Sequence, residues 1–78
     1  MEKITLYTQP DCPPCKIVKM FLQEYNISYH EKDIKNDSKA RSELTGRYGS
    51  YSTPTTVIGD KVIIGFELEQ LKEALQID

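Results

Sequence analysis

The two cysteines of the chain, Cys12 and Cys15, are separated only by Pro13 and Pro14, and this pair constrains the fold more than any other feature. A disulfide between them closes a very short loop, so it restricts little of the unfolded chain and is a weak structural crosslink. The same spacing suits thiol–disulfide exchange, in which one thiolate attacks a disulfide and the second thiol resolves the mixed disulfide. The pair therefore predicts redox chemistry.

The neighbouring residues place the pair between a strand and a helix. Residues 4–7 alternate as a half-buried strand does. Cys12 is a suitable N-cap, and Pro13 suits the first helical position. A backbone N–H at that position would have no acceptor within the helix, so proline, which lacks this group, costs no hydrogen bond there. The helix that follows should pack on a sheet through Val18, Phe21, Leu22 and Tyr25. A Cys-x-x-Cys pair at such a junction is typical of a redox motif.

The length and charge of the chain exclude several classes of protein. At 78 residues we expect one domain over residues 1–78, and the net charge of −2 is spread without the basic face of a nucleic-acid binder. No apolar run approaches the ~20 residues that span a bilayer, and no secretory signal is evident. We therefore expect a cytoplasmic monomer, and in that compartment a transient disulfide is more usual than a structural one.

The remaining elements follow in a regular order. Residues 27–34 favour a second strand, and residues 36–38 offer capping side chains for a second helix. Residues 55–58 and 61–64 are β-rich runs joined by Gly59-Asp60, a two-residue hairpin signal. The inward residues of the second helix would be Ala40, Leu44 and Tyr48, and those of a last helix beginning near Glu67 would be Leu68, Leu71 and Leu75.

The order β-α-β-α-β-β-α predicts an α/β fold with a four-stranded mixed sheet flanked by helices, its first two strands parallel. With Cys12-Pro13-Pro14-Cys15 after the first strand and Thr53-Pro54 before the third, the chain resembles the thioredoxin fold in its short glutaredoxin form. The likeness covers essentially the whole chain and rests on residues 7–15, 52–55 and 64–67.

The resemblance implies specific roles. Cys12 would be the nucleophile, Cys15 the resolving thiol, and the two would form the redox-active disulfide. The Thr53–Pro54 bond would be cis and lie beside that disulfide, so that the Thr53 backbone could pair with an extended substrate. The further candidate substrate-binding residues are Pro13, Pro14, Tyr7, Gln9, Gly65 and Phe66.

Structural alternatives stand beside some of these roles. Tyr7 and Phe66 could be core residues, and Gly65 could serve only to begin the last helix. The cysteines could also contribute to a zinc site, but tetrahedral zinc requires four ligands and the chain has one histidine, His30. That histidine lies among polar residues, so we expect it to be a solvent-exposed side chain.

The surroundings of Cys12 bear on how readily it becomes the reactive thiolate. A helix N-terminus favours the anion through its dipole and unpaired N–H groups. Pro14 has no N–H, so only Cys15 can donate to the capping sulfur. Asp11 opposes the thiolate, whereas Lys16 and Lys19 favour it. We expect Cys12 to be acidified, less than where both donors are present, and Cys15 to be more buried and to act second.

These features predict a dithiol–disulfide oxidoreductase, an electron carrier that holds no bound cofactor and reduces protein disulfides or glutathione mixed disulfides. Gly65-Phe66 is similar to the glutaredoxin-like redoxins that serve ribonucleotide reductase, which makes that enzyme a candidate substrate. Gln9 stands where glutathione-dependent members usually carry lysine. We therefore expect a thioredoxin-reductase-type flavoenzyme as electron donor, with glutathione as the other candidate.

A second class of function is a glutathione-assisted iron–sulfur or metal carrier, in which two chains share a cluster through Cys12. Pro14 argues against this alternative, because it stiffens the loop that would have to open towards the metal. Colourless protein that reduces insulin would favour the oxidoreductase, whereas coloured, iron-containing protein would favour the carrier.

Overall fold

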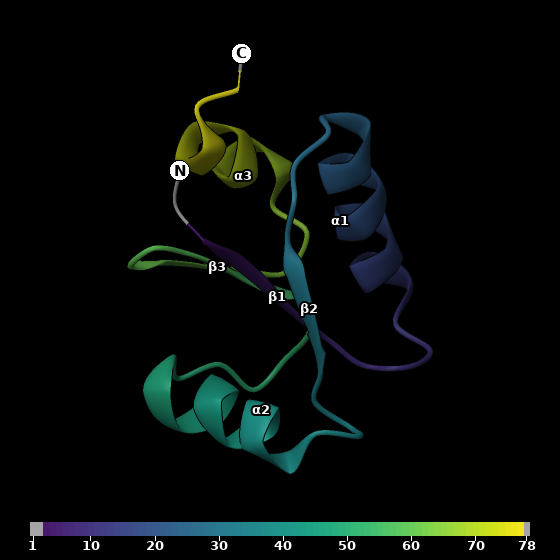
Figure 1. The fold of residues 1–78 in the computed structure, drawn as a ribbon, viewed down its shortest axis with the longest axis vertical. Coiled ribbons are helices and arrows are strands. Elements are labelled where there is room, and N and C mark those ends of the chain that lie inside the picture. The colour runs from purple at the N-terminus through teal and green to yellow at the C-terminus, as the bar shows by residue number, and fades with distance from the viewer. Residues whose placement is uncertain (1–2, 78) are drawn as a thin grey trace.

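A four-stranded sheet forms the middle layer of the protein (Figure 1), and the computed structural model describes residues 3–77. The strand order is β2-β1-β3-β4, with β1 and β2 parallel and the other neighbouring pairs antiparallel. The elements in chain order are β1 (Ile4–Thr8), α1 (Pro13–Glu24), β2 (His30–Asp33), α2 (Ser38–Ser42), the π-helical turn η1 (Glu43–Arg47), β3 (Thr55–Ile58), β4 (Lys61–Ile64) and α3 (Leu68–Leu75). The predicted fold class and element order are confirmed.

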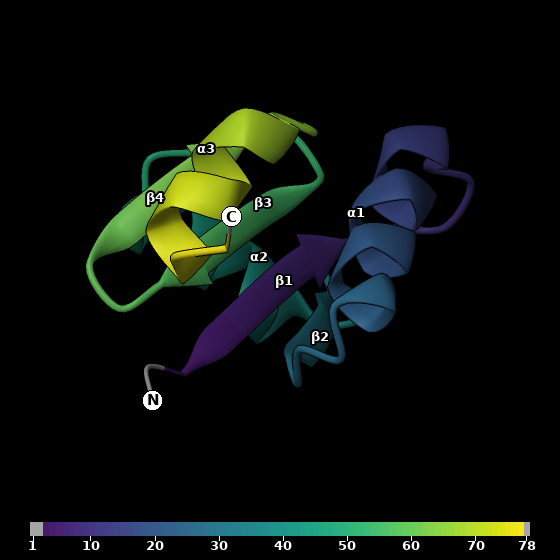
Figure 2. The ribbon, with the colours of Figure 1, turned by 90° about the horizontal axis from the view of Figure 1, so that it is seen from above.

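Helices cover both faces of the sheet (Figures 1 and 2). Helices α1 and α3 lie on one face, and α2 lies on the other. Because successive side chains of each strand point to opposite faces of the sheet, each face has its own hydrophobic core. The first core contains Ile4, Leu6, Val18, Phe21, Leu22, Ile58, Ile63 and Leu71. The second contains Tyr7, Ala40, Leu44 and Val57.

The end of α1 corrects the predicted start of the second strand. Asn26 has φ 57°, and its N–H donates to the Gln23 carbonyl while the N–H of Ile27 donates to the Leu22 carbonyl. These two bonds form a Schellman motif, in which the residue after the left-handed position packs back on the helix. Ile27 is thereby drawn into the first core, and β2 begins only at His30 instead of residue 27.

The second helix is also less regular than predicted. Ala40 and Leu44 are buried as expected, but α2 ends at Ser42 and the chain continues as the wider turn η1. In that turn the N–H of Tyr48 donates to the Glu43 carbonyl, five residues back. Tyr48 consequently lies at the edge of the second core, half-buried.

Two predicted sets of core residues differ in burial. In α3, Leu71 is fully buried, whereas Leu68 and Leu75 pack half-buried around it. Tyr25 was expected to face the sheet, but it lies just beyond the end of α1 and is 40% exposed, with its ring centroid 5.0 Å from that of Phe21.

Within residues 3–77, none of the helices combines the length and apolar character needed to cross a bilayer.

Candidate functional site

Cys12 and Cys15 are joined by a disulfide at the first turn of α1, with their Cα atoms 5.2 Å apart. Cys12 is the N-cap, and its Sγ accepts a hydrogen bond from the backbone N–H of Cys15 at 3.2 Å. Pro13 and Pro14 occupy the first two helical positions, as predicted for a chain that enters the helix here. Cys12 is 7% exposed and Cys15 is 2% exposed. Both cysteines are therefore buried in the disulfide state, and Cys12 is the more exposed of the two.

The loop before β3 lies against this disulfide. The Thr53–Pro54 bond is cis, as the resemblance implied. The Thr53 hydroxyl is 3.6 Å from Cys12 Sγ, and Pro54 is buried. Within residues 3–77, no hydrogen bond engages the backbone N–H or C=O of Thr53. This half-buried backbone, next to the outer sulfur, is open to pairing with an extended chain.

A set of buried hydroxyls holds that loop in place. The Ser50 and Thr55 hydroxyls lie 2.8 Å apart, and the Thr55 hydroxyl donates to the Ser52 carbonyl at 2.7 Å. Both hydroxyl-bearing side chains are almost completely buried. Sequence reasoning did not identify this pair, although Ser and Thr side chains commonly bond to nearby backbone in turns. The pair fixes the position of Thr53 relative to Cys12.

The segment before α3 also reaches the site. The N–H of Gly65 donates to the Pro54 carbonyl at 2.8 Å, and Gly65 has φ 87°, a conformation that favours glycine. Phe66 follows directly and is 54% exposed, so the alternative that it is a core residue is wrong. Gly65 contacts Pro54 and Phe66 adjoins it in the chain, and the role of both residues in binding a substrate stays a prediction.

Tyr7 lies on the opposite face of the sheet from α1. It is buried in the second core, and its hydroxyl donates to Glu43 Oε1 at 3.0 Å. Burial, together with the hydrogen bond and charge of Glu43, raises the pKa of the Tyr7 phenol well above its ordinary value. Lys32 pairs with the same Glu43 oxygen at 2.7 Å. The structure therefore assigns Tyr7 to the core and corrects the expectation that it contacts substrate.

Gln9 is exposed and lines a hollow of about 230 Å³ between the end of β1 and the segment that carries α2 and η1. The hollow also has two cationic side chains, Lys35 and Arg41, and the ring of Tyr51, which is 84% exposed. Neither cation was singled out from the sequence, because they lie far from Gln9 along the chain. The positive charge that Gln9 lacks is thus supplied nearby by other residues.

Comparison with known proteins agrees with this geometry. The family model described as Glutaredoxin matches residues 4–63. The chain belongs to the glutaredoxin family. A curated relative, the glutaredoxin-like 8.6 kDa protein in the rubredoxin operon of Clostridium pasteurianum, is 27% identical over 73 residues, which cover 94% of this chain and 97% of the relative.

Solved structures of similar proteins share the fold. The T8A mutant of the thioredoxin-like protein BC3987 is 52% identical, with a TM-score of 0.95 and complete coverage of both chains. The glutaredoxin of Archaeoglobus fulgidus is 30% identical, with a TM-score of 0.86 over 97% of this chain and 88% of its own. A small glutaredoxin-like protein with the thioredoxin fold is thereby established.

One charged cluster in this glutaredoxin-family protein links the end of β1 to β2 and α1. Glu31 in β2 accepts hydrogen bonds from the buried Thr8 hydroxyl at 2.8 Å and from Lys19 of α1 at 2.7 Å. Burial by itself would raise the pKa of Glu31, but these two donors outweigh it and lower that pKa below its ordinary value. Lys19, expected to favour the Cys12 thiolate, is thus engaged by Glu31.

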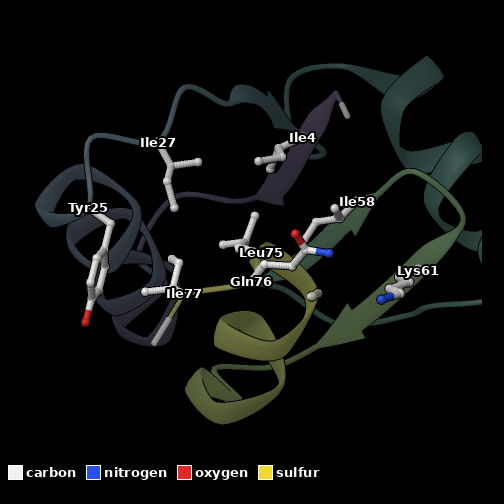
Figure 3. A pocket seen from close by; sticks show the side chains of 9 residues that line it. Ile4, Tyr25, Ile27, Ile58, Lys61, Leu75, Gln76 and Ile77 are labelled. Carbon is white, nitrogen blue, oxygen red and sulfur yellow. The ribbon is translucent and has the colours of Figure 1, made fainter. Parts of the chain in front are cut away.

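A hollow of about 460 Å³ lies at the other end of β1 (Figure 3). It is lined mainly by apolar side chains, among them Ile4, Tyr25 and Ile77, with Lys61 at one side. Because Ile4 begins β1 and the cysteines follow its end, this hollow is separate from the disulfide.

Residues 3–77 contain no group of three or more His, Cys, Asp or Glu side chains placed to hold a metal ion.

Proposed function

We propose that this protein is a dithiol–disulfide oxidoreductase that acts through Cys12 and Cys15 without a bound cofactor. The observation that carries the proposal is the sulfur of Cys12, which caps α1, accepts a hydrogen bond from the Cys15 N–H and lies 3.6 Å from the Thr53 hydroxyl. Membership of the glutaredoxin family supports redox activity of this kind.

The chemistry runs in two exchange steps. In the reduced protein the Cys12 thiolate attacks one sulfur of a substrate disulfide, a mixed disulfide forms, and the other substrate sulfur leaves as a thiolate that takes up a proton. The Cys15 thiol then loses its proton and attacks Cys12 Sγ. This second step releases the remaining substrate thiol and leaves the Cys12–Cys15 disulfide, so two electrons have passed to the substrate.

The difference in burial between the two cysteines supports the proposed order of these steps. Cys12 is the more exposed sulfur, and its anion would keep the N–H donor that the disulfide sulfur already has. Cys15 is almost completely buried, so an external disulfide should reach Cys12 more readily. Cys15 therefore acts as the resolving thiol.

Protein disulfides are the substrate class that the surface suits best. The Thr53 backbone offers pairing groups to an extended segment, and the rings of Tyr51 and Phe66 are exposed near that segment's path. Exposed aromatic side chains are enriched where proteins bind partners. The disulfide of a ribonucleotide reductase is a candidate of this class.

For the electron donor we propose a thioredoxin-reductase-type flavoenzyme. Gln9 carries no charge for the carboxylates of glutathione, and Phe66 narrows the approach to α3, where Glu67 and Glu69 are exposed. Glutathione is the second candidate, because Lys35 and Arg41 line the hollow that Gln9 also lines. Cationic side chains of this kind suit a small anion with two carboxylates.

A coupled assay of NADPH oxidation with insulin as substrate tests both parts of the proposal. One arm contains thioredoxin reductase, the other contains glutathione with glutathione reductase, and Cys12→Ser is the control in each. We expect turnover above the control in the first arm. Absence of turnover in both arms would contradict the oxidoreductase proposal. Efficient turnover with glutathione alone would contradict only the choice of donor.

A further inference from the structure

Three residues other than glycine have a left-handed backbone within residues 3–77: Asp11 and Asn26, both with φ 57°, and Gln76, with φ 59°. Asn26 follows the end of α1 and Gln76 caps the end of α3, which is the usual place for this conformation. Asp11 lies at no helix end. It directly precedes Cys12, whose sulfur caps the start of α1. The ordinary explanation therefore covers two of these residues and leaves out Asp11.

The residues on either side of Asp11 are conformationally restricted. Pro10 and Pro13 have a φ fixed by the proline ring. Gln9 and Cys12 each precede a proline, which disfavours a helical backbone, and Cys12 is extended, with φ −119° and ψ 91°. Among the four residues between β1 and α1, only Asp11 neither is a proline nor precedes one. The freedom to change the direction of the chain is therefore concentrated at Asp11.

The chain reverses its direction in this short connection. Strand β1 ends at Thr8, α1 begins at Pro13, and the helix runs back against the strand (Figure 1). Pro10 and Asp11 form the turn. Within residues 3–77, no hydrogen bond engages Asp11, so the shape of the turn depends on which conformations residue 11 itself adopts. Aspartate is one of the few residues besides glycine that adopt the left-handed conformation readily.

We propose that Asp11 is a positioning residue for the reactive sulfur, because its left-handed backbone turns the chain so that Cys12 becomes the cap of α1. The inference rests on the proposed redox cycle, in which Cys12 attacks first. As the cap, Cys12 Sγ accepts a hydrogen bond from the N–H of Cys15 at 3.2 Å, and a thiolate at this position keeps that donor. Left-handed backbones of residues other than glycine are known to cluster at active sites. A residue that resists this conformation at position 11 shifts the sulfur from its donor and lowers the thiolate fraction of the reduced protein.

Alkylation of the reduced protein by iodoacetamide tests this with the pair Asp11→Ala and Asp11→Gly. Both variants remove the same charge, but alanine resists the left-handed conformation and glycine adopts it freely. Peptide mass spectrometry locates the label at Cys12. The rate at pH 7 divided by the rate at high pH, where the thiol is fully ionised, measures the thiolate fraction. We expect this ratio to be about three- to tenfold lower in Asp11→Ala, since a hydrogen bond to a charged group is weakened.

Two further variants at the same position extend the comparison. Asp11→Asn should resemble Asp11→Gly, because asparagine is enriched in the left-handed conformation and is also uncharged. Asp11→Ser should resemble Asp11→Ala, and it serves in place of that variant if thermal unfolding shows that reduced Asp11→Ala is not folded. The ratio should therefore follow the conformational preference of residue 11 among uncharged side chains.

The pair Asn26→Ala and Asn26→Gly is the matched control. Asn26 has the same φ of 57° and is also exposed, but it lies at the opposite end of α1 from the cysteines. Asn26→Ala should have a lower melting temperature than Asn26→Gly, because alanine is strained there as well. The alkylation ratio at Cys12 should be the same in both.

The result that supports the inference is a difference in the alkylation ratio between alanine and glycine at position 11 and none at position 26. Equal ratios for Asp11→Ala and Asp11→Gly would overturn it. Equal differences at the two positions would also overturn it, because the effect would then follow from stability in general. A wild-type protein in which Cys15 is labelled before Cys12 would instead contradict the proposed function.

Discussion

The Sγ of Cys12 accepts a hydrogen bond from the backbone N–H of Cys15 at 3.2 Å, which makes this sulfur the cap of α1. A capping side chain can accept from the second and third helical residues. Here the second helical residue is Pro14, which has no N–H. One of the two natural donors to the sulfur is therefore missing, and the motif itself limits how strongly the helix stabilises a Cys12 thiolate.

Replacing Pro14 by Ala is expected to restore the missing donor. The thiolate fraction of Cys12 in the reduced protein at pH 7 should rise, and alkylation by iodoacetamide should become about three- to tenfold faster, since hydrogen bonds to charged groups are among the stronger ones. Pro13→Ala is the control, because the first helical residue does not donate to the cap. Identical alkylation rates for the two variants would show that the capping geometry does not govern the thiolate.

Glu31→Gln tests the charged cluster beneath the site. The folded-state pKa of Glu31 is lowered, so its contribution to stability is present above the ordinary carboxyl pKa of about 4.3 and is lost as the pH falls through the folded value. The Lys19–Glu31 pair is partly exposed, which limits the loss in Glu31→Gln at pH 7 to about 1 kcal/mol.

Urea unfolding at pH 7 and at pH 2 measures this effect. The difference in unfolding free energy between wild type and Glu31→Gln should shrink from pH 7 to pH 2, because the Glu31 carboxylate takes up a proton as the pH falls through its lowered pKa. Glu24→Gln, at an exposed position for which no ion pair is found in the described part of the chain, should show little difference at either pH. A deficit of Glu31→Gln that persists at pH 2 would mean that charge is not its cause.

Local signals in the sequence were sufficient for the parts of the fold that depend on neighbouring residues. The cap at Cys12, the hairpin at Gly59-Asp60 and the buried Leu71 follow from cap chemistry, turn chemistry and helical spacing. Strand β2 was predicted to begin three residues too early and to end one residue too late. The early start arose because Ile27 is β-branched but is engaged by the end of α1. A β-branched residue after a helix can either begin the next strand or pack back against the end of the helix. The sequence alone does not indicate which of these two positions Ile27 takes.

The parts of the site that were missed depend on contacts between distant segments. The turn η1 places Glu43 against Tyr7 and Lys32, and no local spacing indicates this. Lys35 and Arg41 meet Gln9 only through the folding of the chain. Tyr7 is buried because its side of β1 is covered by α2. The alternation of residues along the strand does not show which of its two faces α2 covers.

The choice of electron donor can be tested by adding and removing positive charge at the hollow that Gln9 lines. Gln9→Lys combined with Phe66→Gly should raise the kcat/KM for glutathione about tenfold, since each exposed charge pair is worth up to about 1 kcal/mol and the open approach adds to it. Lys35→Gln combined with Arg41→Gln should lower the same kcat/KM.

The control for that experiment is Lys61→Gln, which removes a positive charge at the hollow on the far end of β1. It should leave turnover with glutathione unchanged. If all of these variants and the wild type turn over glutathione equally well, charge at the Gln9 hollow has no part in selecting the donor.

The central claim is that Cys12 attacks and Cys15 resolves, and the order of labelling in the reduced protein tests it most directly. Reduced protein would be treated at pH 7 with less than one equivalent of iodoacetamide, and the label located by peptide mass spectrometry. Cys15→Ser, which keeps the outer thiol, should be labelled at Cys12 and should also accumulate a mixed disulfide with substrate. The account predicts that Cys12 is labelled well before Cys15 in the wild-type protein. Faster labelling of Cys15 would contradict it.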